Sequence, residues 1–321
     1  MADMTASRAA PGEGISLTNK LVLAALLALL LVAPALVYPI ALMKVLCFAL
    51  FACAFNLVLG YTGLLSFGHA AFFGWAAYIG AHVIKVWGLP PELGILAGTA
   101  TGAVLGLGFG WLAIRRQGIY FAMVTLALAQ MMYFVALEVP LTGGEDGIQA
   151  VPRGLLFGLI DLSQPYAMYY TVLAIFLIGF GIIYRTIHSP FGQVLKAIRE
   201  NEPRAISLGY KVDQYKLLAF TLSAALAGLA GATKAVVFQL ASLTDVTWQM
   251  SGEVVLITLL GGVGTVFGPV VGAAIWVLLE TYLSGVGSWV TVIQGTIFVI
   301  VVLTFRKGVV GEIGELLRRR G

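Results

Sequence analysis

The residues with the greatest chemical potential in this sequence are isolated polar groups inside long apolar runs. His69 lies in the segment SFGHAAFFG, Lys234 lies in a run of alanine and glycine, and Glu253 begins another apolar stretch. A charge at the centre of a membrane span costs about 2.5 to 3.5 kcal/mol, so such a group is either paired or functional. We expect Lys234 to pair with Asp245 or Glu253, and we favour a hydrogen-bonded packing role for His69 over proton transfer.

Catalytic and metal-binding sets are hard to assemble from these residues. Cys47 and Cys53 are the only cysteines and lie six positions apart on different helix faces, which argues against a disulfide or a metal site. The segment GGVGTVFG (261–268) lacks the Gly-Lys-Ser/Thr ending and the preceding strand of a phosphate-binding loop. We therefore expect no enzyme activity, metal or cofactor in this chain, and any ATP that drives it would bind a separate polypeptide.

The composition predicts an integral membrane protein. Of 321 residues, 60% are hydrophobic and 11% are charged, and the mean hydropathy is +0.97, whereas soluble chains are about one quarter charged. The apolar runs are about 20 residues long, the length at which a helix crosses a bilayer. The expected fold class is an all-α polytopic membrane protein, and the net charge of +4 requires no nucleic acid.

The apolar runs divide the chain into candidate spans. A disordered tail (1–19) precedes the transmembrane domain (20–306), and a basic cytoplasmic tail (307–321) follows it. The candidate spans are 21–38, 41–59, 65–84, 93–114, 119–137, 166–184, 217–240, a glycine-broken region 253–283, and 289–305. We expect eight crossings plus a re-entrant element, and ten crossings are the alternative.

The distribution of basic residues predicts the orientation. With the N-terminus inside, 15 of the 19 lysines and arginines lie on the cytoplasmic side and Lys44, Lys85 and Arg153 lie outside. The polar segment 185–216 then faces the cytoplasm, with six basic and three acidic residues. Apolar residues near helical spacing within it predict a short amphipathic helix that contacts something outside the membrane.

Two glycine-rich breaks resemble each other. The segments GYTGLLSFG (60–68) and GGVGTVFG (261–268) each join two apolar runs. Such a pair is typical of an internal repeat in which broken helices meet near the membrane midplane and line a substrate route. Close helix packing by small residues is the alternative, and it is our interpretation of two further runs of small residues. These runs are Gly102, Gly106 and Gly110, and Ala224, Gly228 and Gly231.

Together these motifs resemble the permease subunits of bacterial ATP-driven importers for branched-chain amino acids, the LivH/LivM family. One matching set runs from Asn56 to Gly74 and includes GYTGLLSFGHAAFFG; Ala76, where the family often has glycine, departs from the pattern. A second set resembles the LivM branch and consists of Gly118, Ile119, Tyr120, Thr125, Leu126 and Ala127. The loop LTGGEDGI (141–148) and the segment 258–264 with Gly268, Pro269 and Gly272 also match the family. The last match is the polar segment 185–216 with the helix after it.

The resemblance implies roles for three groups of residues. The polar segment would couple the chain to an ATPase through Gly192, Lys196, Ala197, Ile198, Arg199, Glu200, Asn201, Glu202, Ala205, Leu208 and Gly209. The translocation pathway would involve Asn56, Gly60, Gly63, Ser66, Gly68, His69, Thr258, Gly261, Gly262 and Gly264. A delivering protein would dock on Thr142, Gly143, Gly144 and Asp146.

The resemblance also implies partners and a location. They are a second homologous permease forming a heterodimer, two ATPase subunits that bind ATP, and a periplasmic substrate-binding protein, in a bacterial inner membrane with both termini cytoplasmic. Urea or short amides and aromatic acids remain alternative substrates. Two other classes also remain open: an ion-coupled secondary transporter in which Glu253, Lys234 and His69 carry the ion, and a membrane scaffold without transport activity.

Overall fold

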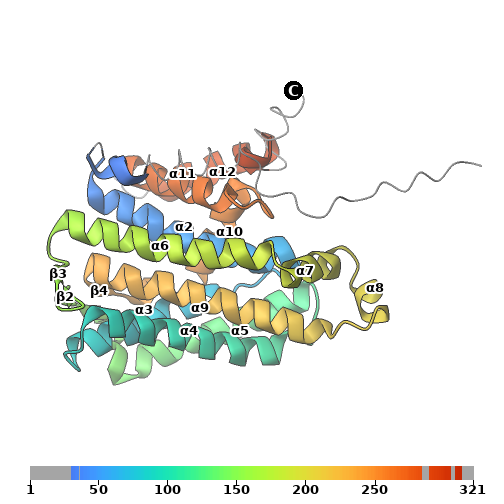
Figure 1. The fold of residues 1–321 in the computed structure, drawn as a ribbon, viewed down its shortest axis with the longest axis horizontal. Coiled ribbons are helices and arrows are strands. Elements are labelled where there is room, and N and C mark those ends of the chain that lie inside the picture. The colour runs from blue at the N-terminus through green and yellow to red at the C-terminus, as the bar shows by residue number, and fades with distance from the viewer. Residues whose placement is uncertain (1–29, 36, 284–288, 305–307, 313–321) are drawn as a thin grey trace, which may run out of the picture.

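The protein is a bundle of roughly parallel and antiparallel α-helices (Figure 1). The computed structural model describes residues 30–35, 37–283, 289–304 and 308–312. The helices are α2 (Pro39–Thr62), α3 (His69–Lys85), α4 (Pro91–Ala113), α5 (Ile119–Glu138), α6 (Pro165–Ile187), α7 (Pro190–Glu200), α8 (Glu202–Ser207), α9 (Val212–Phe238), α10 (Trp248–Gly261), α11 (Gly268–Leu283) and α12 (Val290–Thr304). Five of these, α2, α4, α5, α6 and α9, are long and apolar enough to cross a membrane. The expected all-α polytopic membrane fold is confirmed.

Short elements mark the two ends of the bundle. Strand β1 (Ile148–Gln149) pairs antiparallel with β4 (Leu240–Ala241), and β2 (Leu155–Leu156) pairs with β3 (Ile160–Asp161). Three 3-10 turns, η1 (Pro140–Thr142), η2 (Gly144–Asp146) and η3 (Leu243–Asp245), accompany them. The labelled strands lie at one end of the bundle, and α7 and α8 lie at the other (Figure 1).

Proline sets the start of several helices. Pro39, Pro91, Pro165 and Pro190 each occupy the first helical position of α2, α4, α6 and α7. The fixed φ of proline suits this position, and its missing N–H is one that the helix would not use. Because each proline lies beside an apolar run, the sequence determines where the run becomes helical.

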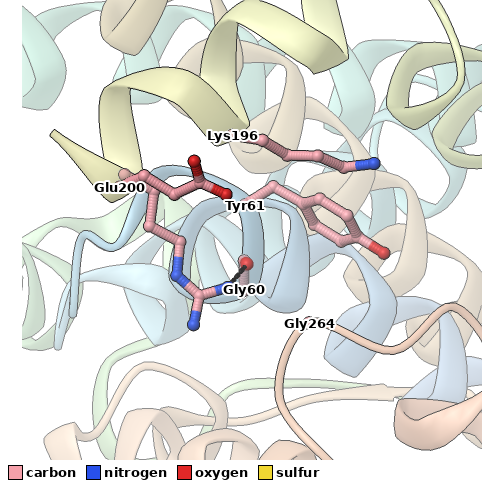
Figure 2. A pocket seen from close by; sticks show the side chains of 6 residues that line it. Gly60, Tyr61, Lys196, Glu200 and Gly264 are labelled. Carbon is pink, nitrogen blue, oxygen red and sulfur yellow. Dashed lines mark hydrogen bonds between the residues drawn. The ribbon is translucent and has the colours of Figure 1, made fainter. Parts of the chain in front are cut away.

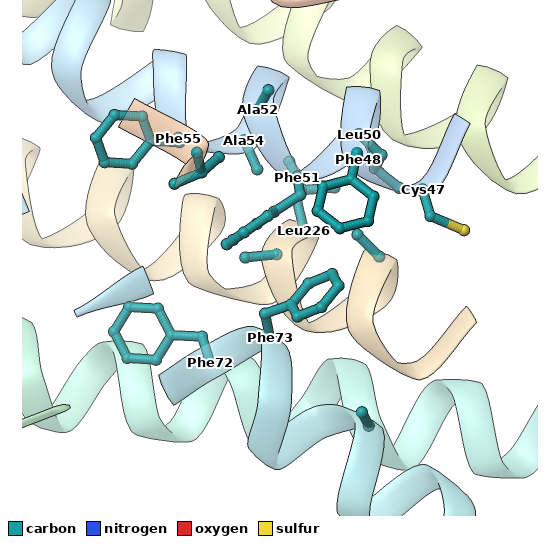
Figure 3. Packing of buried hydrophobic residues seen from close by; sticks show 14 of the residues in the cluster. Cys47, Phe48, Leu50, Phe51, Ala52, Ala54, Phe55, Phe72, Phe73 and Leu226 are labelled. Carbon is teal, nitrogen blue, oxygen red and sulfur yellow. The ribbon is translucent and has the colours of Figure 1, made fainter. Parts of the chain in front are cut away.

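A stretch of aromatic side chains joins α2, α3 and α9 in the centre of the bundle (Figure 3). Phe48 and Phe51 of α2 meet Phe73 of α3, and the rings of Phe51 and Phe73 stack with centroids 4.5 Å apart. Leu226 of α9 lies beside them, and all four side chains are buried. Aromatic pairs of this kind add about 0.5 to 1.5 kcal/mol beyond the burial of their surface.

Small residues hold α4 against α9, as the sequence predicted. A Cβ atom added to Gly102 would lie 2.6 Å from the Ala224 carbonyl oxygen and 3.0 Å from the Gly228 Cα. A Cβ atom added to Gly231 would lie still closer, 2.0 Å from the Phe73 carbonyl oxygen of α3. The backbones therefore touch directly, and dispersion contacts between them replace the hydrophobic drive that is weak between helices in lipid.

The glycine-broken region forms two short antiparallel helices. Helices α10 and α11 have 14 and 16 residues, which span about 21 and 24 Å, less than the ~30 Å hydrocarbon core. Glu280 near the end of α11 pairs with Lys44 near the start of α2 at 2.7 Å, whereas the break at 262–267 lies against the C-terminal part of α2. The pair therefore begins and ends at the same end of the bundle, as expected. The number of full crossings remains a prediction.

Two boundaries differ from the prediction. Helix α3 begins at His69 rather than residue 65, because 63–68 remains a non-helical break that starts at Gly63 with φ +76°. The short amphipathic helix expected in 185–216 is present as α7, but a second helix, α8, which the sequence did not predict, follows it. Asn201 separates them with φ −156°, and its side chain accepts a hydrogen bond from Arg204 N to cap α8. Of the first expected span, 21–38, only 30–35 and 37–38 are described.

The isolated charged side chains each have a polar partner. Lys234 of α9 contacts both carboxylate oxygens of Asp245 at 2.5 and 2.6 Å. Of the two partners expected for Lys234, Asp245 and Glu253, the structure confirms Asp245. Glu253 instead accepts a hydrogen bond from the Trp276 indole N–H. Both partners of the Lys234 pair are largely buried, so the pair neutralises charge inside the bundle and fixes η3 against α9.

We expect Gly102→Leu to destabilise the bundle because the new side chain would force α4 away from α9. Overpacking of this kind costs about 1 to 3 kcal/mol. Thermal unfolding of the purified protein in detergent, followed by tryptophan fluorescence, measures the loss. Gly108→Leu on the same helix is the control, because nothing lies within 4 Å of a Cβ atom at Gly108. Equal melting temperatures for both variants would contradict the packing assignment.

Candidate coupling and translocation site

The two glycine breaks lie side by side although they are far apart in the sequence. A Cβ atom added to Gly60, near the end of α2, would lie 2.7 Å from Gly264 N and 2.9 Å from Gly264 Cα in the second break. Only glycine at position 60 permits this approach. The structure thus brings together Gly60 and Gly264, which the sequence had assigned to the same pathway from their separate motifs.

Asn56 of α2 fastens the second break. Its amide nitrogen donates to the Thr265 carbonyl at 2.9 Å, and its amide oxygen accepts from Gly264 N at 2.9 Å. Asn56 is 3% exposed, so both hydrogen bonds form away from bulk water, where an unpaired backbone group is costly. The Asn56 side chain therefore supplies hydrogen-bond partners to two backbone groups of the second break, where the backbone is not helical.

Local contacts shape the second break itself. Gly262 and Gly264 adopt φ +120° and +78°, conformations that other residues rarely take. The Thr265 hydroxyl donates to the Gly262 carbonyl at 2.7 Å and accepts from Gly268 N at 3.1 Å, where α11 begins. Gly308, beyond α12, packs its backbone against Gly262. The break is consequently a tight turn with fixed geometry.

Helix α7 is amphipathic and anchored at its start. Its buried face carries Leu195 and Ile198, and Gly192 packs against the carbonyls of Thr186 and Ile187 at the end of α6. The Ser189 hydroxyl accepts from Gly192 N at 3.3 Å, which caps the helix. These contacts hold α7 at a fixed angle across the end of α6.

Arg199 connects α7 to both breaks. Its guanidinium donates a hydrogen bond to the Gly60 carbonyl, its Nη1 lies 3.1 Å from the Cβ position of Gly264, and its Cγ lies 3.3 Å from that of Gly63. Figure 2 shows Lys196 and Glu200 on α7 facing Gly60 and Tyr61 of α2, with Gly264 nearby. The predicted coupling helix and the predicted pathway elements therefore meet at one side chain.

A cavity lies at this meeting point. Its volume is about 440 Å³, and it is lined by Gly60, Tyr61, Lys196, Arg199, Glu200 and Gly264 (Figure 2). The Lys196 ammonium lies 5.8 Å from the centre of the Tyr61 ring, a cation–π distance. The cavity joins residues that the sequence placed in two different groups, coupling and pathway.

Helix α8 is tied to α9. Glu202 at the start of α8 pairs with Lys216 of α9 at 2.6 Å, and Lys216 is 3% exposed. Ala205 is buried in a small cluster with Ile198 and Val212. Of the predicted coupling residues, Ala197, Arg199, Glu200, Asn201, Leu208 and Gly209 are exposed. The α7–α8 unit thus has one face fixed to the bundle and one face open.

Three polar residues predicted for the pathway lie inside the packing. The His69 ring contacts the Ser223 hydroxyl through Nε2 at 2.9 Å, and Ser223 donates to the Ala54 carbonyl. The rings of Phe55, Phe72 and Phe220 surround His69. Because the Ser223 proton is used at Ala54, the histidine Nε2 is the donor.

Ser66 and Thr258 are equally enclosed. Ser66 Oγ accepts from Gly68 N at 3.1 Å, and the Thr258 hydroxyl donates to the Val254 carbonyl at 2.8 Å. Both side chains are buried, as is His69. None of the three lines the cavity between α2 and α7, and Gly63, Gly68, Gly261 and Gly262 contribute backbone to the breaks without lining it.

The outer loop differs from expectation at one residue. Thr142 is fully buried, and its hydroxyl lies within hydrogen-bond distance of the Ala136 and Val139 carbonyls. Its predicted role as a surface contact for a delivering protein is therefore wrong, because the side chain completes the end of α5. Gly143 and Asp146 are exposed, and Gly144 is half-buried. Gly143 and Gly144 turn the loop with φ +78° and +60°.

Comparison with known proteins identifies the family. Residues 37–302 match the family described as the branched-chain amino acid transport system / permease component. The chain belongs to this family. The permease is 28% identical to the high-affinity branched-chain amino acid transport system permease protein LivM of Escherichia coli (strain K12) and to its counterpart in Salmonella typhimurium, over 92% of this chain and 76% of each relative.

A further relative extends the comparison. The inner membrane ABC transporter permease protein YjfF of Escherichia coli (strain K12) is 30% identical over 71% of each chain. No solved structure matches this permease. The family match covers both glycine breaks and the α7–α8 unit.

Exposed apolar residues beside α8 escaped the sequence analysis. Ile206 is 57% exposed and Tyr210 is 40% exposed, beside Leu208 at 68%. Ile206 lies in α8, and Leu208 and Tyr210 follow that helix. Apolar residues in a highly charged segment were a usable hint of a contact surface.

Removing the Asn56 amide will loosen the second break. In Asn56→Ala, the Gly264 N–H and the Thr265 carbonyl lose their partner, which costs about 1 to 3 kcal/mol for each buried group left unsatisfied. Hydrogen exchange measured by mass spectrometry should show faster exchange across 262–267. The control is Thr62→Val on the same helix, which removes only a local bond to the Val58 carbonyl. An unchanged rate of hydrogen exchange across 262–267 in Asn56→Ala would show that the second break keeps its conformation without the Asn56 hydrogen bonds.

Proposed function

We propose that this chain is the LivM-like permease subunit of an ATP-driven importer for branched-chain amino acids in a bacterial inner membrane. The family match over 37–302 and the similarity to LivM proteins support the activity and the substrate class. The apolar helices support a multi-pass location. The observation that carries the mechanism is the contact of Arg199 with the first break, next to Gly264 of the second.

The importer needs other subunits. ATPase subunits supply the energy, and a periplasmic binding protein delivers the amino acid; the names of the relatives as ABC and transport-system permeases favour both. We further propose that two ATPases serve a heterodimer of this chain and a second homologous permease. In this proposal ATP binds to the separate ATPase subunits, and the permease contributes the membrane pathway.

The open face of the α7–α8 unit is the proposed ATPase contact. Its exposed side chains include Arg204, Ile206 and Leu208, a mixture of charge and apolar surface suited to a protein interface. The opposite face reaches the pathway through Arg199 and reaches α9 through the Glu202 ion pair. ATP-driven closure of the ATPases would displace this unit as a rigid body.

Displacement of α7 would then act on the two breaks together. Asn56 joins them by two hydrogen bonds, and Arg199 contacts Gly60 while lying against Gly264. A shift of Arg199 changes the relative positions of α2, α10 and α11. Such a two-state rearrangement would open the pathway alternately to each side of the membrane. The cavity beside Arg199 provides room for that movement.

Orientation follows from charge. The excess of lysine and arginine at the α7 end favours a cytoplasmic location for that end and for both termini. The strands and η1 and η2 then face the periplasm. Gly143, Gly144 and Asp146 remain the proposed contact for the binding protein, through exposed backbone and one carboxylate.

Reconstitution tests the function. The purified complex of this chain with its partner subunits is placed in proteoliposomes with ATP inside and with leucine-loaded binding protein outside. We expect leucine uptake that requires hydrolysable ATP and survives a proton ionophore. Uptake that collapses with the ionophore would indicate the ion-coupled class instead. Uptake of urea or an aromatic acid without uptake of leucine would retain the mechanism but replace the substrate.

Charge reversal at Arg199 tests the coupling. Arg199→Glu removes the donor to the Gly60 carbonyl and places a carboxylate against it, so we expect leucine uptake to fall by about tenfold or more, the range of typical coupling energies. ATP hydrolysis should continue without transport, or the ATPase should dissociate. Arg115→Glu is the control, because Arg115 contacts Trp111 outside the α7–α8 unit. Equal uptake by both variants and the wild type would remove Arg199 from the mechanism.

A further inference from the structure

A groove between α6 and α9 lies outside the proposed pathway. It has a volume of about 480 Å³ and opens near the start of α7. Its lining residues are Ile182, Arg185, Thr186, Ser189, Phe191, Leu218 and Leu222. The groove therefore combines an apolar wall from two helices with one cation and two hydroxyl groups.

The apolar wall is open to the surroundings. Leu218 of α9 is 61% exposed, and Ile182 of α6 is 41% exposed. Exposed leucine and isoleucine on adjacent transmembrane helices are compatible with contact to acyl chains. The wall continues to Leu222, one helical turn further into the bundle on α9.

Arg185 gives the groove its charge. Within the described part of the chain, Lys44, Lys216 and Lys234 form ion pairs with carboxylates, whereas Arg185 forms none. Arg185 is exposed in the last turn of α6. An arginine at a groove of this kind presents a fork of N–H donors that matches a phosphate group.

The depth of Arg185 fits a membrane surface. Tyr166 and Tyr170 at the start of α6 are 57% and 45% exposed, and exposed tyrosines are typical of the interface between lipid and water. Arg185 follows Tyr166 by 19 residues of continuous helix, which is about 28 Å at the helical rise and close to the thickness of the hydrocarbon core. Its guanidinium consequently lies at headgroup level when Tyr166 lies at the opposite surface.

We propose that this groove binds one anionic phospholipid. Its phosphate pairs with Arg185, and one acyl chain lies along Leu218 and Leu222. Basic pockets between transmembrane helices recognise anionic headgroups in this way. A protein partner would supply a carboxylate for Arg185 instead, and the experiment below separates the two occupants.

The position of the groove gives the lipid a structural consequence. Ser189 and Phe191 belong to the start of α7, and the Ser189 hydroxyl donates to the Thr186 carbonyl at the end of α6. Phe191 also stacks on Tyr215 of α9 with ring centroids 5.5 Å apart. A lipid between α6 and α9 would therefore steady the junction at which α7 leaves the bundle.

Native mass spectrometry of the full chain in detergent tests the proposal. The protein is titrated with dioleoyl phosphatidylglycerol and, separately, with dioleoyl phosphatidylcholine, which has the same acyl chains. We expect one phosphatidylglycerol to bind preferentially, and Arg185→Gln to weaken it by about fivefold, the effect of one basic residue near a lipid surface. Arg185→Lys should retain most of the binding.

Matched controls decide the outcome. Arg115→Gln removes a cation outside the groove and should leave lipid binding unchanged, whereas Leu222→Trp fills the apolar wall and should weaken it. Glycerol phosphate without acyl chains should not displace the lipid. Equal phosphatidylglycerol binding by wild type and Arg185→Gln overturns the proposal. A second measurement, co-purification of Arg185→Gln with the ATPase and the second permease, also overturns the proposal if the variant keeps the lipid but loses either subunit, since the groove is then a protein interface.

Discussion

The structure depends on the side-chain carboxamide of Asn56, which holds α2, just before the first glycine break, against the second glycine break. Asn56 donates to the second break and accepts from it, and glycine at position 60 allows the backbones to touch. The Asn56 side chain is buried and the hydrogen bonds are shielded in part from solvent, so loss of the carboxamide leaves two backbone groups without their partner. Helices α2, α10 and α11 therefore keep a fixed relation at the point where none of them continues regularly.

The α7–α8 unit is built on that joint. Arg199 reaches the Gly60 carbonyl, which is free to accept because α2 ends at Thr62 and its last carbonyls lack helical partners. The Glu202–Lys216 pair ties the start of α8 to α9, three residues after Arg199. Both attachments therefore lie at the junction of α7 and α8. A single long helix across 190–207 would have carried the residues after Asn201 in a different direction.

The sequence was informative where a residue type has few possible uses. Glycines at 60 and 264 indicated close backbone approach. An asparagine inside an apolar run indicated hydrogen bonding, and the charges of Lys234 and Asp245 indicated an ion pair. It was misleading at Thr142, because a threonine in a polar loop resembles a surface contact until its hydroxyl is found at the end of α5. Ile206 and Tyr210 were missed because an apolar residue gives no sign of its own exposure.

The sequence by itself determined the membrane class, the helical segments, the two breaks and the charged end of the bundle, because hydropathy, glycine and charge act locally along the chain. Only the tertiary structure decided that Asn56 binds Gly264 and Thr265, that Arg199 contacts Gly60, and that Glu253 meets Trp276 rather than Lys234. These contacts join residues up to 209 positions apart. Local patterns carry no information on such pairs, since the crossing and rotation of packed helices select them.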